Sequence, residues 1–212
     1  MIHRSRLALP LLALLALAPL RASQAQSISF GITGGASLST FTGDLVEDAK
    51  NYSTYIVGGF ARIGAMGFAV QPGLYYTGKG AKSESASGTT AGTVKLNYIQ
   101  VPLVLRLGIG SGKSRLYVGA GPAIGFKVSC KLAQPTTSSY SGTDCAEGAS
   151  EDPVKSTEVS GIVEAGIEFG KFSIGARGDL GLTNAIESVQ SGSTSNLGIK
   201  TRTVSAVAAI RF

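Results

Sequence analysis

Apolar residues alternate with small or polar residues along most of this chain. In the first such segment Ile28, Phe30 and Ile32 share one side, and small or polar residues occupy the other. A period of two is typical of β-strands, because successive side chains point to opposite faces. The pattern predicts an all-β protein with eight antiparallel strands, at residues 28–33, 55–63, 68–77, 98–107, 115–128, 158–169, 172–183 and 203–212.

The connections between these segments alternate in length. Three are short and contain the glycine that tight turns require: 64–67, 109–114 and 170–171. Four are long and polar: 40–54, 80–93, 129–157 and 184–202. This layout is typical of an up-and-down transmembrane β-barrel, with turns in the periplasm and loops outside the cell. An even number of strands places both chain ends on the periplasmic side.

Positive charge predicts which face such a barrel turns to the lipid. A Lys or Arg that faces lipid at mid-membrane costs about 2–4 kcal/mol. The polar faces of the predicted strands carry five arginines and are therefore expected to point into the lumen: Arg62, Arg106, Arg115, Arg177 and Arg211. A water-soluble sandwich would place its charged faces outside, and alternation by itself leaves that alternative open. Strand lengths near the roughly 9–11 residues that cross a bilayer favour the barrel.

Three prolines, Pro72, Pro102 and Pro122, lie inside predicted strands. Proline has no N–H to donate to a ladder, and a closed barrel has no edge strand to accommodate it. We therefore expect bulges or missing ladder pairs at these positions.

The N-terminus predicts export. His3, Arg4 and Arg6 precede an apolar run over 7–20 that is too short to span a membrane, and small residues around Ala25 fit a signal-peptidase site. We expect a signal peptide at 1–25 and a barrel domain at 26–212. Cleavage would lower the net charge from +6 to about +3, and the remaining basic residues are scattered. This scattering argues against nucleic-acid binding.

Three segments of the chain resemble a known family. They are Gly73-Leu-Tyr-Tyr-Thr-Gly-Lys-Gly80, Tyr98-Ile-Gln-Val-Pro-Leu-Val-Leu-Arg-Leu107 and Tyr117-Val-Gly-Ala-Gly-Pro-Ala-Ile-Gly-Phe126. They are similar to the PorT-like outer-membrane β-barrels, often called the porin family. The resemblance implies an eight-stranded barrel in the bacterial outer membrane and makes prolines at such strand positions ordinary. It implies little about activity.

Residues that support catalysis or metal binding are scarce. The only histidine, His3, would leave with the signal peptide, which excludes a histidine general base or histidine metal ligand in the processed chain. Asp44, Glu47 and Asp48 cluster in the first long connection, where a solvated acidic loop is the simpler interpretation than a cation site. We expect no enzyme, cofactor or metal.

Cys130 and Cys145 are the two cysteines of the chain and lie within the third long connection. Exported proteins meet an oxidising compartment, which favours a disulfide between them. Such a bond would close a loop of about 16 residues and stabilise the fold by about 3 kcal/mol on the chain-entropy estimate. Two free thiols are the alternative.

The lumen is expected to hold acids beside its bases. Glu164, Glu168 and Asp179 share the polar face with the five arginines. Eight strands leave an interior just wide enough for side chains, so a packed core of ion pairs is the favoured interpretation. A charged lining for a narrow channel is the alternative.

The sequence has no Trp, so an interfacial aromatic girdle would have to be built by Tyr and Phe, with Tyr76, Phe126, Phe169, Phe172 and Phe212 as candidates. The family resemblance assigns Phe212 a second role, since a terminal aromatic residue is the signal that the barrel-assembly machinery reads.

These features favour a non-enzymatic barrel that acts structurally or through contacts of its loops. Outer-membrane lipid and lipopolysaccharide are the expected surroundings. The alternatives are a narrow pore for small polar solutes or ions, and a component of a secretion assembly.

Overall fold

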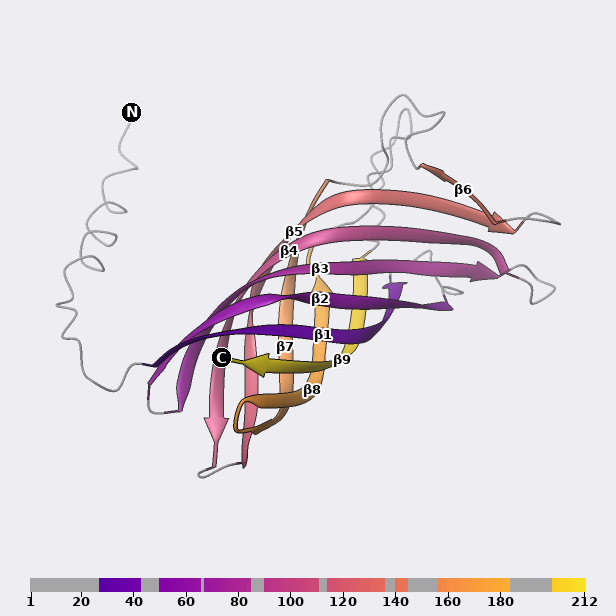
Figure 1. Ribbon diagram of the computed structural model, residues 1–212. Helices are drawn as coiled ribbons and strands as arrows, with labels where there is room; N and C mark the ends of the chain where they lie inside the picture. Colours follow the sequence, from indigo (N-terminus) through magenta and orange to yellow (C-terminus); the bar gives the residue numbers. More distant parts are fainter. Residues whose placement is uncertain are drawn as a thin grey trace, which may run out of the picture.

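Nine strands form one antiparallel sheet in the computed structural model, and eight of them close into a barrel (Figure 1). The structure describes residues 27–42, 50–65, 67–84, 90–110, 114–135, 140–144, 156–183 and 200–212. The strands are β1 (Ser27–Thr42), β2 (Lys50–Ala65), β3 (Phe68–Glu84), β4 (Thr90–Ile109), β5 (Ser114–Pro135), β6 (Tyr140–Asp144), β7 (Thr157–Phe169), β8 (Phe172–Gly181) and β9 (Lys200–Arg211).

Each barrel strand pairs with its neighbour along the chain, and the first strand pairs with the last. Pairing of β4 with β5 and of β1 with β9 completes the ring. The short strand β6 pairs with residues 131–135 at the end of β5, which β7 does not reach. We call the end that carries the short connections the turn end and the opposite end the loop end. No helix among the described residues is long and apolar enough to cross a membrane.

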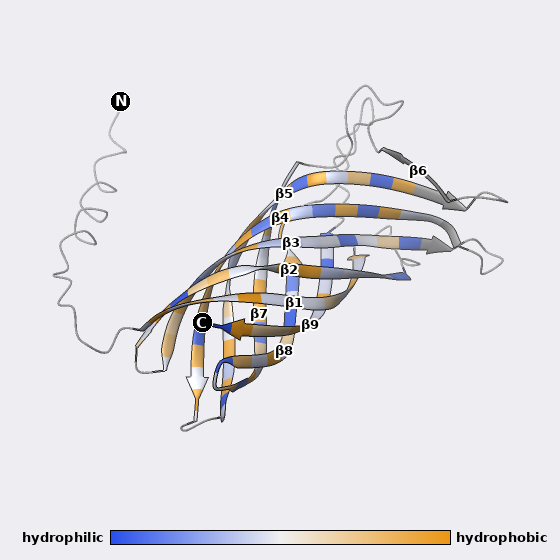
Figure 2. Cartoon of the chain, in the orientation of Figure 1, coloured by the Kyte–Doolittle hydropathy of each residue, from blue (hydrophilic) through white to orange (hydrophobic). Residues whose placement is uncertain are grey.

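The alternation seen in the sequence separates the two faces of the wall. Outward apolar side chains are widely exposed, for example Ile28 at 67% and Leu105 at 63%, whereas the inward Tyr98 is 1% and Arg177 4% exposed. Orange and blue residues alternate along the strands in Figure 2. A water-soluble sandwich would have the reverse arrangement, so the predicted barrel with its polar face inward is confirmed.

Several strands are longer than the sequence pattern predicts. Residues 80–84 and 90–93 belong to β3 and β4, and 129–135 belong to β5, although all were expected in loops. The short strand β6 was not expected at all. Strand pairing explains the difference, because cross-strand backbone hydrogen bonds keep a chain extended where side-chain alternation fades.

The four strands β3, β4, β5 and β6 continue beyond the closed wall at the loop end (Figure 1). The ladder between β5 and β7 ends at the pair Phe126 and Thr157, whereas β5 runs on to Pro135. At about 3.3 Å per residue this extension is about 30 Å along the strand. We call this part of β3 to β6 the projecting sheet.

The prolines sit where the ladders have gaps. Pro72 is paired with Leu103, and Pro102 with Ala123, but the next two rungs are missing in each ladder while the register stays the same. One of the missing rungs would have joined Pro122 to Leu103. Missing ladder pairs are therefore confirmed, and bulges at the prolines are not. The register shift between β4 and β5 lies instead at Asn97 and Tyr98.

Two expectations about processing and covalent cross-linking fall outside the described residues. The signal peptide at 1–25 is one of them. The disulfide is the other, because Cys145 is not described, although Cys130 is buried at the loop end. Both remain predictions.

Candidate functional site: the charged lumen

Strands β7 and β8 supply most of the charge inside the barrel. Period-two spacing turns Glu158, Glu164 and Glu168 of β7 inward, together with Arg177 and Asp179 of β8. All five are at most 9% exposed. Arg177 pairs with Glu164 on the neighbouring strand, whereas the other cationic partners come from β2, β3, β4 and β9, so most of the ion pairs cross the lumen.

Near the turn end, arginines converge on two glutamates. Arg62 Nη1 lies 2.5 Å from Glu168 Oε1, and Arg106 Nη1 lies 3.2 Å from the same oxygen. Arg106 also donates from Nε to Glu164, and Arg177 Nη1 lies 3.6 Å from Glu164 Oε2. We call this set, together with Arg211, the turn-end cluster; Arg211 Nη1 is 3.6 Å from Glu168 Oε2.

Aromatic rings cover the guanidinium groups of this cluster. Arg106 lies 3.9 Å from the centroid of the Tyr117 ring, and Arg177 lies 4.9 Å from that of Tyr75. Stacking on an aromatic face satisfies the flat surface of a guanidinium group while its edge donates hydrogen bonds. Arg106 and Arg177 are thereby held by an aromatic ring against the guanidinium face and by hydrogen bonds or ion pairs at its edge.

A second set of charges lies nearer the loop end. Lys79 Nζ donates to Glu158 Oε1 at 2.9 Å and to Asp179 Oδ1 at 3.0 Å. Thr201 donates to the same Glu158 oxygen, and Gln100 donates to Asp179 while accepting from Arg177 Nη2 at 3.3 Å. Gln100 thus links this loop-end cluster to the turn-end cluster.

Apolar side chains fill the rest of the interior. Ile56, Phe60 and Tyr75 form one buried group, and Val104, Ala123 and Ile162 form another. At the loop end, Leu96 and Tyr98 pack with Phe41, Ala81 and Cys130. The lumen is therefore packed with apolar and charged side chains together, whereas the sequence predicted a polar core.

The structure brings together seven of the eight charges that the sequence placed in the lumen. Arg115 is the exception, because it is exposed at the turn end and forms no ion pair with any described residue. The sequence also missed Lys79, which the predicted third strand did not reach. Glu158 stood on the predicted polar face of its strand, and that position was the available signal for it.

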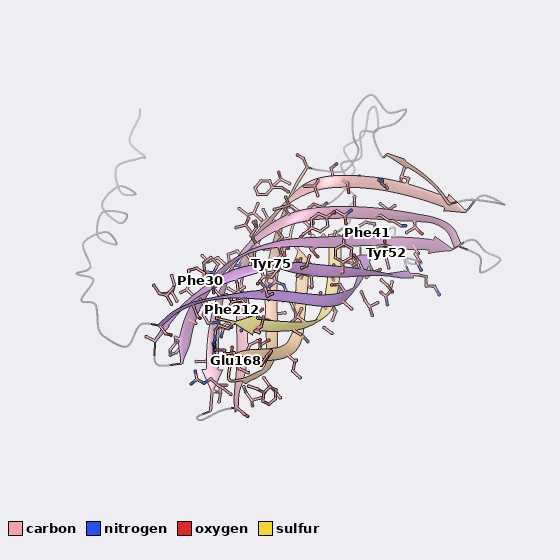
Figure 3. All side chains as sticks on the ribbon, in the orientation of Figure 1. Phe30, Phe41, Tyr52, Tyr75, Glu168 and Phe212 are labelled. Atoms are coloured by element: carbon pink, nitrogen blue, oxygen red, sulfur yellow. The ribbon has the colours of Figure 1, made fainter. Side chains whose placement is uncertain are left out.

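Two aromatic bands border the apolar outer wall. Phe30, Phe68, Phe169, Phe172 and Phe212 are exposed near the turn end, and Tyr55, Tyr76 and Phe126 face outward near the loop end. Figure 3 shows Phe30 and Phe212 near one end of the barrel and Phe41 and Tyr52 towards the other. Phe68 and Tyr76 lie on one strand, and their spacing corresponds to about 20 Å of membrane depth for a strand tilted by about 40°.

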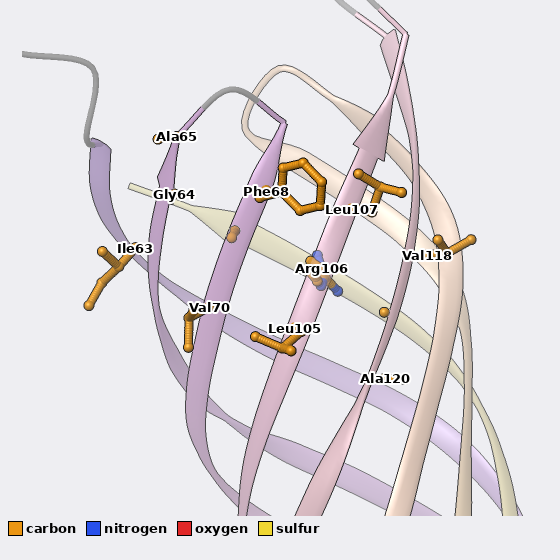
Figure 4. A pocket seen from close by; sticks show the side chains of 12 residues that line it. Ile63, Gly64, Ala65, Phe68, Val70, Leu105, Arg106, Leu107, Val118 and Ala120 are labelled. Carbon is orange, nitrogen blue, oxygen red and sulfur yellow. The ribbon is translucent and has the colours of Figure 1, made fainter. Parts of the chain in front are cut away.

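The outer wall is hollowed between β2 and β5 near the turn end. A groove of about 620 Å³ is lined by apolar side chains that include Ile63, Phe68 and Leu105 (Figure 4). Arg106 lines the same wall, but its buried side chain belongs to the lumen. The groove continues the apolar surface between the two aromatic bands.

Outside the loop-end aromatic band, the outward charges whose side chains the structure describes are positive. Register places Lys50 opposite Lys82, and Lys95 opposite Lys131, and each cross-strand pair shares a face of the sheet. Arg202 and Lys200 lie on the outer face of β9, two and four residues from the exposed Val204 towards the loop end. We call these six cations the cationic collar: Lys50, Lys82, Lys95, Lys131, Lys200 and Arg202. Lys131 also faces Asp144 in the ladder. The four carboxylates whose side chains the structure describes all lie in the lumen.

The described residues contain no group of three or more His, Cys, Asp or Glu that could hold a metal ion. Asp44, Glu47 and Asp48 lie outside the described residues, so the acidic loop is not placed.

Comparison with known families identifies the architecture. The family model described as outer membrane protein beta-barrel domain matches residues 24–187. The chain belongs to this family. It is therefore an outer-membrane β-barrel, and barrels of this kind carry their short turns in the periplasm and their long loops outside the cell. The narrower PorT-like resemblance remains a sequence-based prediction.

Solved outer-membrane barrels are similar to this chain at low sequence identity. Neisserial surface protein A is 13% identical with a TM-score of 0.48, and the match covers 88% of this chain and 99% of that one. Ail of Yersinia pestis, in complex with the heparin analogue sucrose octasulfate, is 18% identical with a TM-score of 0.43 and the same coverage. OprG of Pseudomonas aeruginosa is 12% identical with a TM-score of 0.46, covering 89% and 97%. No curated protein matches the sequence.

Proposed function

We propose that this protein is a non-enzymatic outer-membrane barrel with a closed lumen that presents the projecting sheet outside the cell as a contact surface. The observation that carries the proposal is the combination of a filled interior with strands that continue beyond the wall. A pore needs an open path along the axis, and a purely structural barrel does not need strands longer than the membrane is thick.

The closed lumen is supported by side chains that reach across it. Arg106 on β4 contacts Glu164 and Glu168 on β7, and Lys79 on β3 contacts Asp179 on β8. The aromatic and apolar side chains of Phe60, Tyr75 and Val104 occupy the space beside these pairs. Moving a hydrated ion along this axis would require several buried ion pairs to separate at once.

Planar-bilayer recording tests the closed lumen. Folded protein, whose state is checked by heat-modifiable gel migration of the same sample, is expected to give no reproducible unitary current. A stable unitary conductance from folded protein would favour the narrow pore and contradict the proposal.

Epitope insertion tests the exposure of the projecting sheet. A short tag placed between β5 and β6, at 136–139, is expected to bind antibody on intact cells. The matched control is the same tag at the β7–β8 turn, 170–171, which is expected to bind antibody only after the outer membrane is permeabilised. Labelling of both tags, or only the second, on intact cells would overturn the assignment.

We further infer that the cationic collar contacts the phosphate groups of lipopolysaccharide. The collar lies directly outside the loop-end aromatic band, which is the depth of the headgroups in the outer leaflet. A Lys or Arg near an anionic lipid surface contributes about 1 kcal/mol of binding free energy. Six cations distributed over β2, β3, β4, β5 and β9 are positioned around much of the barrel.

A further inference from the structure

A cavity of about 250 Å³ lies at the turn end of the lumen. Its rim includes Ser27, Gly67 and Gly108, which stand where strands begin or turn, so the cavity is at the periplasmic mouth. With about 30 Å³ for each water, it has room for about eight waters, or for a small ion with part of its hydration shell.

The side chains that line this cavity have an excess of positive charge. Four guanidinium groups meet one carboxylate, namely Arg62, Arg106, Arg115 and Arg211 against Glu168. Glu168 is already shared by three of the arginines, at 2.5, 3.2 and 3.6 Å. The neighbouring Glu164 is likewise shared between Arg106 and Arg177. The lining residues therefore leave three positive charges without a carboxylate of their own.

Two of the four arginines are buried in contact with the glutamates. Arg62 and Arg106 are each 8% exposed, and their geometry is set by Gln71, by the glutamates and by the Tyr117 ring. Positive charge that is withdrawn from water is costly unless an anion accompanies it. Arg115 and Arg211 stand nearer to solvent, where a ligand arriving from the periplasm would meet them first.

We propose that this periplasmic cavity binds an oxyanion of the phosphate type. Guanidinium groups donate two parallel hydrogen bonds to phosphate oxygens, and several of them converging on one cavity favour a multiply charged anion. Two sources carry this chemistry: a soluble phosphate or phosphomonoester, and the phosphodiester headgroup of a phospholipid in the inner leaflet of the outer membrane.

Titration calorimetry on the folded full-length barrel, in uncharged detergent at low ionic strength, tests the site with inorganic phosphate as the probe. Saturable binding is expected. Arg115→Gln and Arg211→Gln are each expected to weaken it about tenfold through loss of a charge-assisted hydrogen bond. Arg115 has no ion pair with any described residue, so this variant keeps the fold, which heat-modifiable migration verifies.

Lys171→Gln is the matched control, because Lys171 is an exposed cation at the same end that does not line this cavity. It is expected to leave phosphate affinity unchanged. Absence of saturable binding, or equal weakening by Lys171→Gln and Arg115→Gln, would overturn the site.

Dimethyl phosphate as a second probe separates the two sources. Binding as tight as that of inorganic phosphate assigns the site to a phosphodiester headgroup, whereas binding at least tenfold weaker assigns it to a soluble phosphate or monoester. Failure of this site would leave the closed-lumen proposal intact, since conductance tests that proposal separately.

Discussion

Each buried charge in the lumen depends on partners that are remote in sequence. Lys79 of β3 meets Glu158 of β7 and Asp179 of β8, which are 79 and 100 positions away along the chain. Its ammonium group is also 5.6 Å from the centroid of the Tyr98 ring. One cation between two carboxylates is stable only while all three keep these positions, because the loss of one partner leaves a buried charge uncompensated.

Lys79→Gln is expected to destabilise the barrel by about 3–5 kcal/mol, because it leaves Glu158 and Asp179 facing each other in the lumen. The measurement is the urea dependence of folding into lipid vesicles. Lys82→Gln is the control on the same strand, since Lys82 belongs to the collar, and a change within about 0.5 kcal/mol is expected.

Replacement of the whole group provides the complementary experiment. Lys79→Met combined with Glu158→Gln and Asp179→Asn is expected to recover more than half of the loss, because no uncompensated charge remains. A triple variant less stable than Lys79→Gln would contradict the ion-pair account.

Strands β4 and β5 approach each other closely because glycine lies at the point of contact. A Cβ atom added at Gly121 would lie 2.0 Å from the Leu103 carbonyl oxygen, which is far inside van der Waals contact. Gly121 is next to Pro122, in the part of the β4–β5 ladder where rungs are missing. Small size at this position therefore compensates for the irregular backbone that proline imposes on the wall.

Gly121→Ala is expected to destabilise the barrel by about 1–3 kcal/mol, because backbone must move to admit the methyl group. Gly161→Ala is the matched control on the adjoining strand β7, where an added Cβ meets nothing within 4 Å, and it is expected to be neutral or slightly stabilising. Urea unfolding of both variants in vesicles measures the difference, and equal losses would show that close approach is not the cause.

The collar operates at the level of strands, since its cations occupy one face of several neighbouring elements. Lys82→Gln combined with Lys95→Gln is expected to weaken lipopolysaccharide binding roughly 30-fold, which follows from about 1 kcal/mol per lysine. Binding is measured with lipopolysaccharide-containing vesicles at several salt concentrations, because screening weakens contacts between exposed charges. The double variant is compared with Lys171→Gln at the periplasmic end, and the same loss in both would contradict a localised collar.

Closure of the whole barrel joins the two ends of the described chain. Strands β1 and β9 pair from Gly31 with Arg211 to Thr42 with Lys200, and the Phe212 amide donates to the Phe30 carbonyl oxygen at 2.8 Å. The Phe212 side chain is 68% exposed and is therefore accessible at the periplasmic end. It contributes contact area to the lipid boundary rather than to the core.

We propose that Phe212 is the residue that the barrel-assembly machinery reads, so Phe212→Ala is expected to slow assembly in cells by several-fold while folding into detergent, which depends on core packing, stays unchanged. Phe30→Ala is the matched control, since Phe30 is 62% exposed at the same end and is not part of the proposed signal. Pulse-chase measurement of the heat-modifiable form follows assembly. Equal delays in the two variants would indicate a loss of lipid contact instead of a loss of signal.

The sequence by itself determined the strands in the wall and the face that each turns to the lumen. Alternation shows for each residue which face of the strand it occupies, and an arginine that faces lipid is costly at any position in the wall. The inward placement of Arg62 and Arg177 could therefore be predicted without knowing their ion-pair partners. The same reasoning stopped at Lys79, because glycines flank it and the alternation is weak there.

Only the tertiary structure decided which charges meet and how far the strands continue. The contacts of Lys79, Arg106 and Gln100 depend on the stagger of strands around a closed ring, which no local pattern encodes. The projecting sheet continues past the last β5–β7 rung, where its inner face still buries Ala81, Leu96 and Cys130 while lysines occupy its outer face, so no alternation of lipid-facing apolar residues marks it in the sequence. Arg115 is exposed because it is the second residue of β5, at the turn end of the barrel. Its contribution to the positive charge at the periplasmic mouth therefore also depends on where the barrel wall ends.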